Sequence, residues 1–199
     1  MTLRSGKKAL LALSGSLALA IGSLGIVAAP AQATEGDTTV RGVTIPAFYN
    51  PPSTLPAKNG TIIRSEPMDL NVRLTGSFGK LPGTATRVMF KSTDTLNQPV
   101  AVTGAYIESA TAWKGKGKRP LVVVAAGTMG QGDQCSPSMG LEAPIRLDLK
   151  NENMSAGYEI LSVYRLLAKG VSVMLTDYVG LGATDRVHTY MNRLDQAHT

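Results

Sequence analysis

The stretch LVVVAAGTMGQGDQCSPS spans residues 121–138 of a 199-residue chain, and its first six residues, Leu121 to Ala126, are all apolar. The apolar run stops at Gly127, where a glycine-rich loop begins. Strands that are buried on both faces carry such unbroken runs, and they occur mainly inside parallel sheets. We therefore predict an interior strand at residues 121–126.

A helix and a second apolar strand follow the loop. Apolar residues recur at helical spacing between Ser155 and Lys169, and Gly170 stands where the helix should end. The apolar stretch Val171–Thr176 predicts another strand, so strand, loop, helix and strand form a βαβ unit. We therefore predict an α/β fold with a parallel sheet, and a last helix that begins near Thr189.

Two more strands are predicted ahead of the interior strand. The sequences RVMFKST (Arg87–Thr93) and PVAVTGAYIES (Pro99–Ser109) flank a polar turn at Asp94–Gln98. In the second sequence, larger residues such as Val102 and Tyr106 alternate with smaller ones, which is typical of a half-buried strand. We predict an antiparallel hairpin.

The first 33 residues have the features of a secretory signal peptide. Three basic residues precede the apolar stretch Ala9–Ala29, and Ala31-Gln32-Ala33 is a small-residue cleavage site. We predict cleavage after Ala33 and a secreted protein. Such a protein would be held at a membrane only if the signal stayed uncleaved.

Residues 34–67 contain five prolines and no helical period. This composition predicts an extended proline-rich arm or a set of turns. Packing of Phe48 and Tyr49 onto the domain, and a flexible linker, are the two alternatives for the segment. The predicted organisation is a signal peptide at residues 1–33, the arm at 34–67 and an α/β domain at 68–199.

The positive charge of the chain does not indicate a nucleic-acid partner. The formal net charge is +6, from 20 Lys and Arg against 14 Asp and Glu. Three of the basic residues lie in the predicted signal, which has no acidic residue, so the remainder carries 17 minus 14, or +3. Lys114, Lys116, Lys118 and Arg119 lie among glycines without interleaved aromatic residues, which is typical of a solvated loop.

The loop Gly127–Ser138 is the candidate functional site, because open α/β sheets bind ligands beyond the carboxyl ends of their parallel strands. Its glycines allow neighbouring backbone N–H groups to converge on one negatively charged oxygen. The loop would then be an oxyanion hole for ester cleavage, with Thr128 and Met129 as amide donors, or a phosphate cradle for a nucleotide. An ordinary strand-to-helix turn is the third alternative.

The dinucleotide hypothesis fits the sequence less well. The glycine spacing is G-x-x-G-x-G, which differs from the dinucleotide fingerprint. The nearest acidic residue at a strand end is Asp177, about fifty residues further on, whereas the fingerprint has an acid about twenty residues away. An exported protein would also seldom meet such a nucleotide.

The sequence contains four segments that together resemble one known family, and they extend from about Ala47 to Gln196. They are FYNPPSTLPAKNGTIIRSEPM, RVMFKSTDTLNQPVAVTGAYIE, RPLVVVAAGTMGQGDQCSPS and VSVMLTDYVGLGATDRVHTYMNR. The family is the secretory lipases, exported α/β-hydrolases that cleave triacylglycerols and other esters. The resemblance implies an incomplete α/β-hydrolase sheet, with the N-terminal strands, the oxyanion-loop region and the first crossover helix.

The resemblance also implies roles for individual residues. It places an oxyanion donor at Thr128 or Met129, and it places Asp177 at the floor of the site without a catalytic role. It implies that Cys135, the only cysteine, bonds to a cysteine that lies much further along in the family. It implies no cofactor, and a lipid or ester as the substrate of the complete family member.

The catalytic triad of the family is not found in this sequence. A serine hydrolase of this fold needs a G-x-S-x-G elbow, followed along the chain by an acid and a histidine. No G-x-S-x-G occurs at a predicted strand-to-helix turn, and His188 and His198 precede the position of such a serine. The histidines also lack the regularly spaced ligands of a metal site. We therefore expect a truncated, inactive lipase or esterase; the alternative is a non-catalytic secreted binding protein on a partial hydrolase fold.

Overall fold

The computed structural model describes the chain from residue 36 onward, with short gaps. The chain divides into two units, residues 1–31 and 32–199, and every described residue belongs to the second unit. The predicted signal peptide and its cleavage site lie outside the described residues. The described ranges are 36–40, 42–70, 73–74, 79–142, 145–148, 153–156, 159–183 and 185–199.

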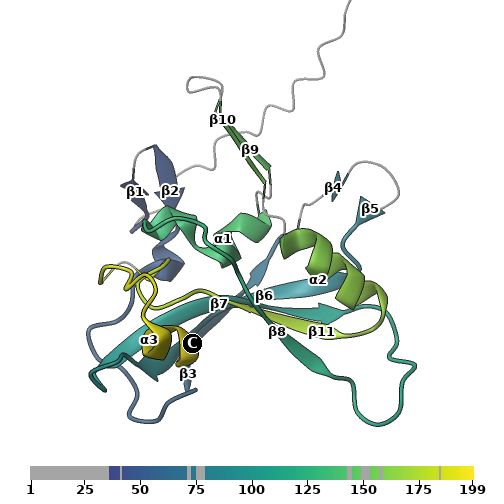
Figure 1. Cartoon of the computed structure of the whole chain (residues 1–199), viewed down its shortest axis with the longest axis horizontal. Helices are drawn as coiled ribbons and strands as arrows, with labels where there is room; N and C mark the ends of the chain where they lie inside the picture. The colour runs from purple at the N-terminus through teal and green to yellow at the C-terminus, as the bar shows by residue number, and fades with distance from the viewer. Residues whose placement is uncertain are drawn as a thin grey trace, which may run out of the picture. The chain divides into compact units, whose positions relative to one another are not determined.

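Five strands form the main sheet (Figure 1). In the order of the sheet they are β3 (Ile62–Met68), β6 (Gly83–Thr93), β7 (Pro99–Ser109), β11 (Ser172–Thr176) and β8 (Leu121–Ala125). Neighbouring strands from β3 to β11 pair antiparallel, whereas β11 and β8 are parallel. The sheet is therefore mixed, and the predicted parallel arrangement holds for one pair.

The predicted hairpin is confirmed, because β6 and β7 pair from Gly83 opposite Ser109 to Thr93 opposite Pro99. The predicted half-buried alternation of β7 is wrong, since most of its side chains on both faces are buried. One face packs under the helices, and residues such as Val102 pack in a separate buried cluster on the other face. Because β7 is the central strand of the sheet, its side chains are buried on both faces despite the alternation of larger and smaller residues in its sequence.

The strand β8 was predicted to be interior and buried on both faces, and this prediction is wrong for the described residues. Among the described strands, β8 pairs only with β11 and so lies at the edge of the sheet. Leu121 and Val123 are 56% and 58% exposed. Burial among the described residues therefore does not explain why these two side chains are apolar.

The predicted crossover helix is α2 (Glu159–Ala168). It begins later than the predicted Ser155, because residues 153–156 form β10 (Asn153–Ala156), which pairs with β9 (Ile145–Asp148). The helix ends before Gly170, whose φ of +82° is a conformation that glycine adopts without strain. Its buried residues are Glu159, Ile160, Val163 and Leu167.

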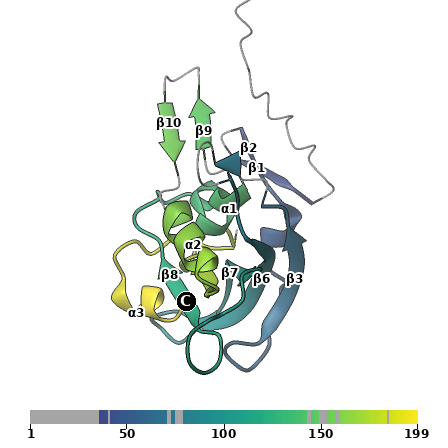
Figure 2. The ribbon, with the colours of Figure 1, turned by 90° about the vertical axis from the view of Figure 1, so that its right-hand side faces the viewer.

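The helices α1 (Pro137–Glu142) and α2 cover one face of the main sheet (Figure 1). Figure 2 shows the two helices side by side above the strands. Their apolar side chains meet those of β7 and β11 in one buried cluster. The last helix, α3 (Arg193–Ala197), lies on the opposite face, where a hollow separates it from Val123 and Met174.

The segment 34–67 contains regular structure that the sequence did not predict. After β1 (Thr38–Val40) and β2 (Val43–Ile45), which form a small hairpin, comes the 3-10 helix η1 (Ala47–Tyr49) and then β3 of the main sheet. Phe48 and Tyr49 are buried, in agreement with packing of these two residues onto the domain. The guanidinium of Arg87 lies 5.3 Å and 5.2 Å from their two ring centroids.

Two smaller features complete the fold. β4 (Arg73–Leu74) and β5 (Gly79–Lys80) pair antiparallel. The helix α3 begins later than the predicted Thr189, because the side chain of Asn192 caps it by accepting hydrogen bonds from the backbone N–H groups of Leu194 and Asp195. Among the described residues, no helix has the length and apolar character needed to cross a bilayer.

Candidate functional site

The loop that follows β8 opens onto a pocket of about 210 Å³. The pocket lies beyond the carboxyl ends of the parallel strands β8 and β11, where Ala125 is paired with Thr176. This is the position at which open α/β sheets bind ligands. Both predicted amide donors line it, and the lining residues are Ala126, Gly127, Thr128, Met129, Gly130, Tyr178, Leu181, His188, Tyr190, Met191 and Gln196.

Neighbouring groups hold the start of this loop in place. The Tyr178 hydroxyl donates a 2.7 Å hydrogen bond to the carbonyl oxygen of Ala126, and the N–H of Gly127 points at Glu159 Oε1, 3.4 Å away. Met129 packs against the buried cluster beneath α2. Among the described residues, no acceptor is found for the backbone N–H of Thr128 or of Met129. Two adjacent amides at the pocket thus have no acceptor within the described part of the chain.

The opposite wall of the pocket comes from the segment that follows β11. The hydroxyls of Tyr190 and Thr128 lie 2.9 Å apart and form a hydrogen bond across the pocket. The His188 ring stacks on Tyr178, with centroids 6.1 Å apart, and meets Tyr190 edge to face at 6.0 Å. Three rings therefore line the side of the pocket that faces the glycine loop.

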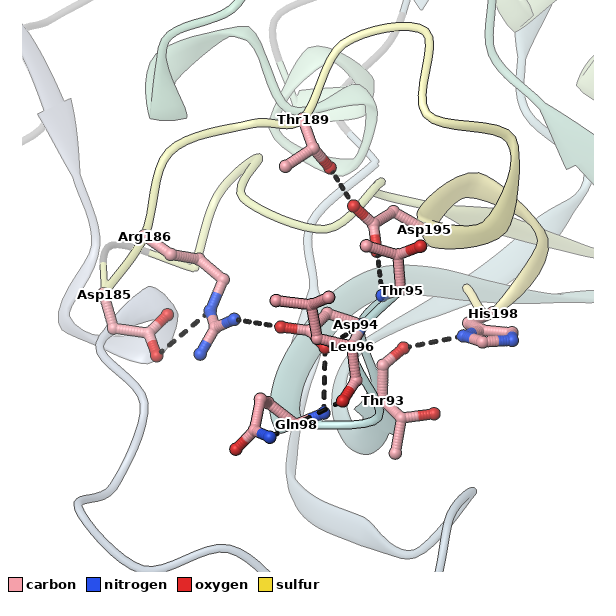
Figure 3. Close-up of polar contacts among 10 residues, drawn as sticks. All are labelled: Thr93, Asp94, Thr95, Leu96, Gln98, Asp185, Arg186, Thr189, Asp195 and His198. Atoms are coloured by element: carbon pink, nitrogen blue, oxygen red, sulfur yellow. Dashed lines mark hydrogen bonds and ion pairs between the residues drawn. The ribbon is translucent and has the colours of Figure 1, made fainter.

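Polar contacts with the β6–β7 turn hold this second wall (Figure 3). Arg186 pairs with Asp94 at 3.3 Å, and the buried Asp195 carboxylate accepts hydrogen bonds from the backbone N–H of Thr95 and the hydroxyl of Thr189. These contacts join parts of the chain that lie far apart in the sequence. The wall that carries His188 and Tyr190 is therefore fixed to the main sheet.

The two histidines occupy different environments. His188 is 7% exposed, and its Nδ1 lies 2.8 Å from the carbonyl oxygen of Val179. His198 is exposed, and its Nδ1 lies 2.9 Å from the carbonyl oxygen of Thr93 (Figure 3). The described part of the chain contains no group of three or more His, Cys, Asp or Glu residues that could hold a metal ion.

Asp177, at the end of β11, anchors the far end of the loop. Its carboxylate accepts hydrogen bonds from the backbone N–H of Ser138 at 2.8 Å, from Ser138 Oγ at 2.6 Å and from Thr103 Oγ1 at 2.7 Å. The Tyr49 hydroxyl lies 2.6 Å from Ser138 Oγ. Asp177 therefore ties the first residues of α1, which follow the loop, to β7 and β11.

Burial raises the pKa of two groups in this network. Asp177 is fully buried, and the loss of hydration raises its pKa from 3.8 to about 6, although the hydrogen bonds from Ser138 and Thr103 oppose the rise. Burial also raises the pKa of Tyr49, and the nearby Asp177 carboxylate adds to that effect. The position of Asp177 at the floor of the site, without a catalytic role, stays a prediction.

None of the described residues that line the pocket is a serine, cysteine, aspartate or glutamate. Ser138 has a carboxylate partner, but it is 0% exposed, so a substrate cannot reach its hydroxyl. The described lining residues thus supply backbone amides and aromatic rings, without a serine, cysteine or carboxylate nucleophile.

Cys135 belongs to the 3-10 helix η2 (Asp133–Cys135) and is a half-buried free thiol. Its Sγ lies against Gly130, where a Cβ would come within 2.6 Å of the sulfur. Gly130 has a φ of +116°, so the loop needs a glycine here both for its backbone and for the sulfur. The disulfide that the family resemblance implies stays a prediction.

A larger hollow of about 570 Å³ lies under α3, on the face of the sheet opposite α1 and α2. Its ionisable side chains already have partners: Lys91 donates to Asn59, and the His198 ring meets the Thr93 carbonyl. Exposed Val123 lies on its wall. The smaller pocket at the strand ends is the better candidate site, since it is lined by Thr128 and Met129, whose amides have no described acceptor.

The wall of the pocket formed by the glycine loop was predicted from the sequence, whereas the wall formed by the segment after β11 was not. Thr128 and Met129 were found because they follow a predicted strand. Tyr178 follows Asp177 at a strand end and was detectable by the same rule. Tyr190 and Met191 reach the pocket only through the long-range contacts to the β6–β7 turn, for which the sequence carries no local signal.

The mixed sheet, the crossover helix and the strand-end loop together resemble part of an α/β-hydrolase fold. The sequence matches no protein-family model and no curated protein sequence. The structure is similar to that of Candida antarctica lipase A in its closed state, with a TM-score of 0.52 and 17% identity over 66% of this chain and 28% of that chain. A second structure of Candida antarctica lipase A gives a TM-score of 0.51 at the same identity.

A third match is the rice cell wall degrading esterase LipA from Xanthomonas oryzae. Its TM-score is 0.37 and its identity 16%, over 63% of this chain and 30% of that chain. The match to lipase A supports a lipase/esterase-like fold and says nothing more specific about the family. The chain spans 28% of the length of the lipase to which it is similar.

Proposed function

We propose that this chain is the N-terminal part of a secreted carboxylic-ester hydrolase of the secretory lipase type, with triacylglycerols among its substrates. In this proposal the backbone N–H groups of Thr128 and Met129 bind the carbonyl oxygen of the ester and stabilise the negative charge that develops on it. The proposal is supported most directly by two adjacent residues that line a strand-end pocket and whose backbone N–H groups have no described acceptor.

The lining of the pocket favours an uncharged carbonyl over a phosphate. No Lys or Arg is among its described lining residues, whereas phosphate sites usually combine backbone amides with basic side chains. Ala126, Leu181 and Met191 supply apolar surface beside the amides. An ester has one polar carbonyl and apolar flanks, and it therefore matches this surface better than a nucleotide does.

The catalytic residues belong, in this proposal, to a further part of the sheet that pairs with β8. Among the described strands only β11 pairs with β8, so its other edge and its exposed Leu121 and Val123 are the surface against which such a part would pack. Coverage of only 28% of lipase A agrees with this view. Without a nucleophile and a general base, a triad enzyme loses about a million-fold in rate. We therefore propose that these residues bind an ester without hydrolysing it.

Titration of the chain with ethyl butyrate, followed by ¹⁵N–¹H correlation spectra, tests the ester site. We expect the amide signals of Thr128 and Met129 to move downfield and to saturate, because a hydrogen bond to the ester carbonyl deshields an amide proton. Gly117, in the exposed loop 115–118, is the internal control and should not move. In Thr128→Pro and Met129→Pro variants, which each lack one N–H, the response of the remaining donor should weaken.

Titration with inorganic phosphate forms the second arm of this experiment. If phosphate moves the Thr128 and Met129 signals and ethyl butyrate does not, the loop is an anion cradle and the ester proposal is wrong. If neither compound moves them, the loop is an ordinary strand-to-helix turn.

A further inference from the structure

The second wall of the pocket presents a hydrogen-bond acceptor. The Val179 carbonyl can only accept, so the Nδ1 of His188, 2.8 Å away, carries the proton of this hydrogen bond. In the neutral imidazole the other nitrogen, Nε2, is then an acceptor. Nε2 has no hydrogen-bond partner among the described residues, and His188 lines the pocket. A ligand in the pocket that reaches Nε2 would therefore meet an acceptor without a described partner.

The hydroxyl pair across the pocket presents a donor. Thr128 Oγ1 and the Tyr190 hydroxyl share one hydrogen bond of 2.9 Å. Whichever of the two donates, the other keeps its own proton for a further acceptor. Tyr190 also touches the edge of the His188 ring, with centroids 6.0 Å apart. An acceptor on the second wall thus lies close to a hydroxyl pair that offers a donor.

A simple alkyl ester satisfies only part of this arrangement, because it can accept hydrogen bonds but cannot donate one. Its carbonyl would occupy the amides of Thr128 and Met129 and leave His188 Nε2 without a donor. A free hydroxyl group both donates and accepts. Charged groups fit less well, since no Lys, Arg, Asp or Glu is among the described lining residues.

We propose that His188 and Tyr190 select esters whose alcohol part carries a free hydroxyl group, such as partial glycerides and glycol monoesters. The hydroxyl of the ligand donates to His188 Nε2 and accepts from the Thr128–Tyr190 pair, while the ester carbonyl lies on the loop amides. The inference rests on the proposed ester site and adds the chemical class of the alcohol.

The test compares two ligands with the same acyl group, ethyl butyrate and 2-hydroxyethyl butyrate, on the full chain. We expect the hydroxy ester to bind roughly fivefold more tightly, which corresponds to one net hydrogen bond. The preference should disappear in Tyr190→Phe, which keeps the ring and removes the hydroxyl. It should also disappear in His188→Asn, whose amide can still donate to the Val179 carbonyl but offers nothing at the position of Nε2.

A measurement on the native chain keeps the test independent of the stability of the variants. With ¹⁵N-labelled histidine, the Nε2 resonance of His188 should shift toward that of a hydrogen-bonded nitrogen with 2-hydroxyethyl butyrate and stay in place with ethyl butyrate. Equal affinity for both esters with an unmoved Nε2 signal would overturn the inference and leave the ester site intact. If neither ester moves the Thr128 and Met129 amides, the proposed function itself fails.

Discussion

Replacement of Asp177 by alanine is expected to lower the free energy of unfolding by about 3–5 kcal/mol. The carboxylate accepts hydrogen bonds from the backbone N–H and the hydroxyl of Ser138 and from the hydroxyl of Thr103, and alanine leaves these buried donors without an acceptor. A buried donor without a partner costs about 1–3 kcal/mol. Urea unfolding followed by circular dichroism measures the loss, and an unchanged midpoint would show that the network does not hold α1 to the sheet.

Replacement of Asp177 by asparagine is the matched control, because an amide of the same shape keeps an acceptor for the Ser138 N–H. Comparison with this variant also shows how much of the pH dependence of stability comes from the Asp177 carboxyl group. The folded pKa of about 6 exceeds the ordinary value of 3.8, so between roughly pH 4 and pH 6 the unfolded chain loses this proton first. The protonated carboxyl group stabilises the folded chain at low pH. The free energy of unfolding should therefore fall by about 3 kcal/mol as the pH rises through this window.

The asparagine variant cannot titrate, so its stability should lack this part of the decline. The difference between the native and variant curves from about pH 4 to pH 7 removes the contributions of other groups. Parallel curves would show that the folded protein already ionises Asp177 at low pH.

The second large effect is expected at Gly180, where alanine should cost about 2–5 kcal/mol. Gly180 has a φ of +76°, and a Cβ there would lie 2.5 Å from the backbone of Val187 and His188. The left-handed conformation costs a non-glycine residue about 1–2 kcal/mol, and overpacking adds about 1–3 kcal/mol. Because the clash falls on backbone atoms, the segment that carries the second wall of the pocket must move.

Gly60 separates the two contributions, since its φ is +77° and a Cβ there would meet nothing within 4 Å. We expect Gly60→Ala to show only the backbone cost, about 1–2 kcal/mol. Chemical unfolding of both variants gives the two values, and amide signals of His188 and Tyr190 should shift only in Gly180→Ala. Equal destabilisation with unmoved signals would mean that the close packing of Gly180 does not position this wall.

Much of the sheet could be predicted, because β-strand patterns are local. The β6–β7 hairpin and the pairing of β8 with β11 follow from apolar runs and a polar turn. The same local patterns could not show that β3 joins the sheet. Pro67 is the last residue but one of β3, and the sequence of this strand resembles the rest of the predicted proline-rich arm. The start of α2 was missed because residues 153–156 pair with another strand, which no helical period reveals.

The residues of the candidate site could be predicted from the sequence only where they directly follow a strand. Thr128 and Met129 follow a strand directly, so the strand-end rule found them. His188 and Tyr190 lie beside them because Arg186 and Asp195 bind the turn at Asp94 and Thr95, about ninety residues or more away in the sequence. The edge position of β8 also lay beyond sequence reasoning, because an apolar run predicts burial and does not say which element supplies it.

The release of p-nitrophenolate from p-nitrophenyl butyrate by the full chain, beside its Thr128→Pro variant, tests the proposed incomplete esterase site. We propose that these residues supply the carbonyl-binding part of an esterase site without its nucleophile. We therefore predict that the native chain, in samples whose Thr128 and Met129 amides respond to ethyl butyrate, releases p-nitrophenolate no faster than the variant or buffer. Release that is well above buffer in the native chain and lost in the variant would contradict this proposal, because a nucleophile would then act within these residues.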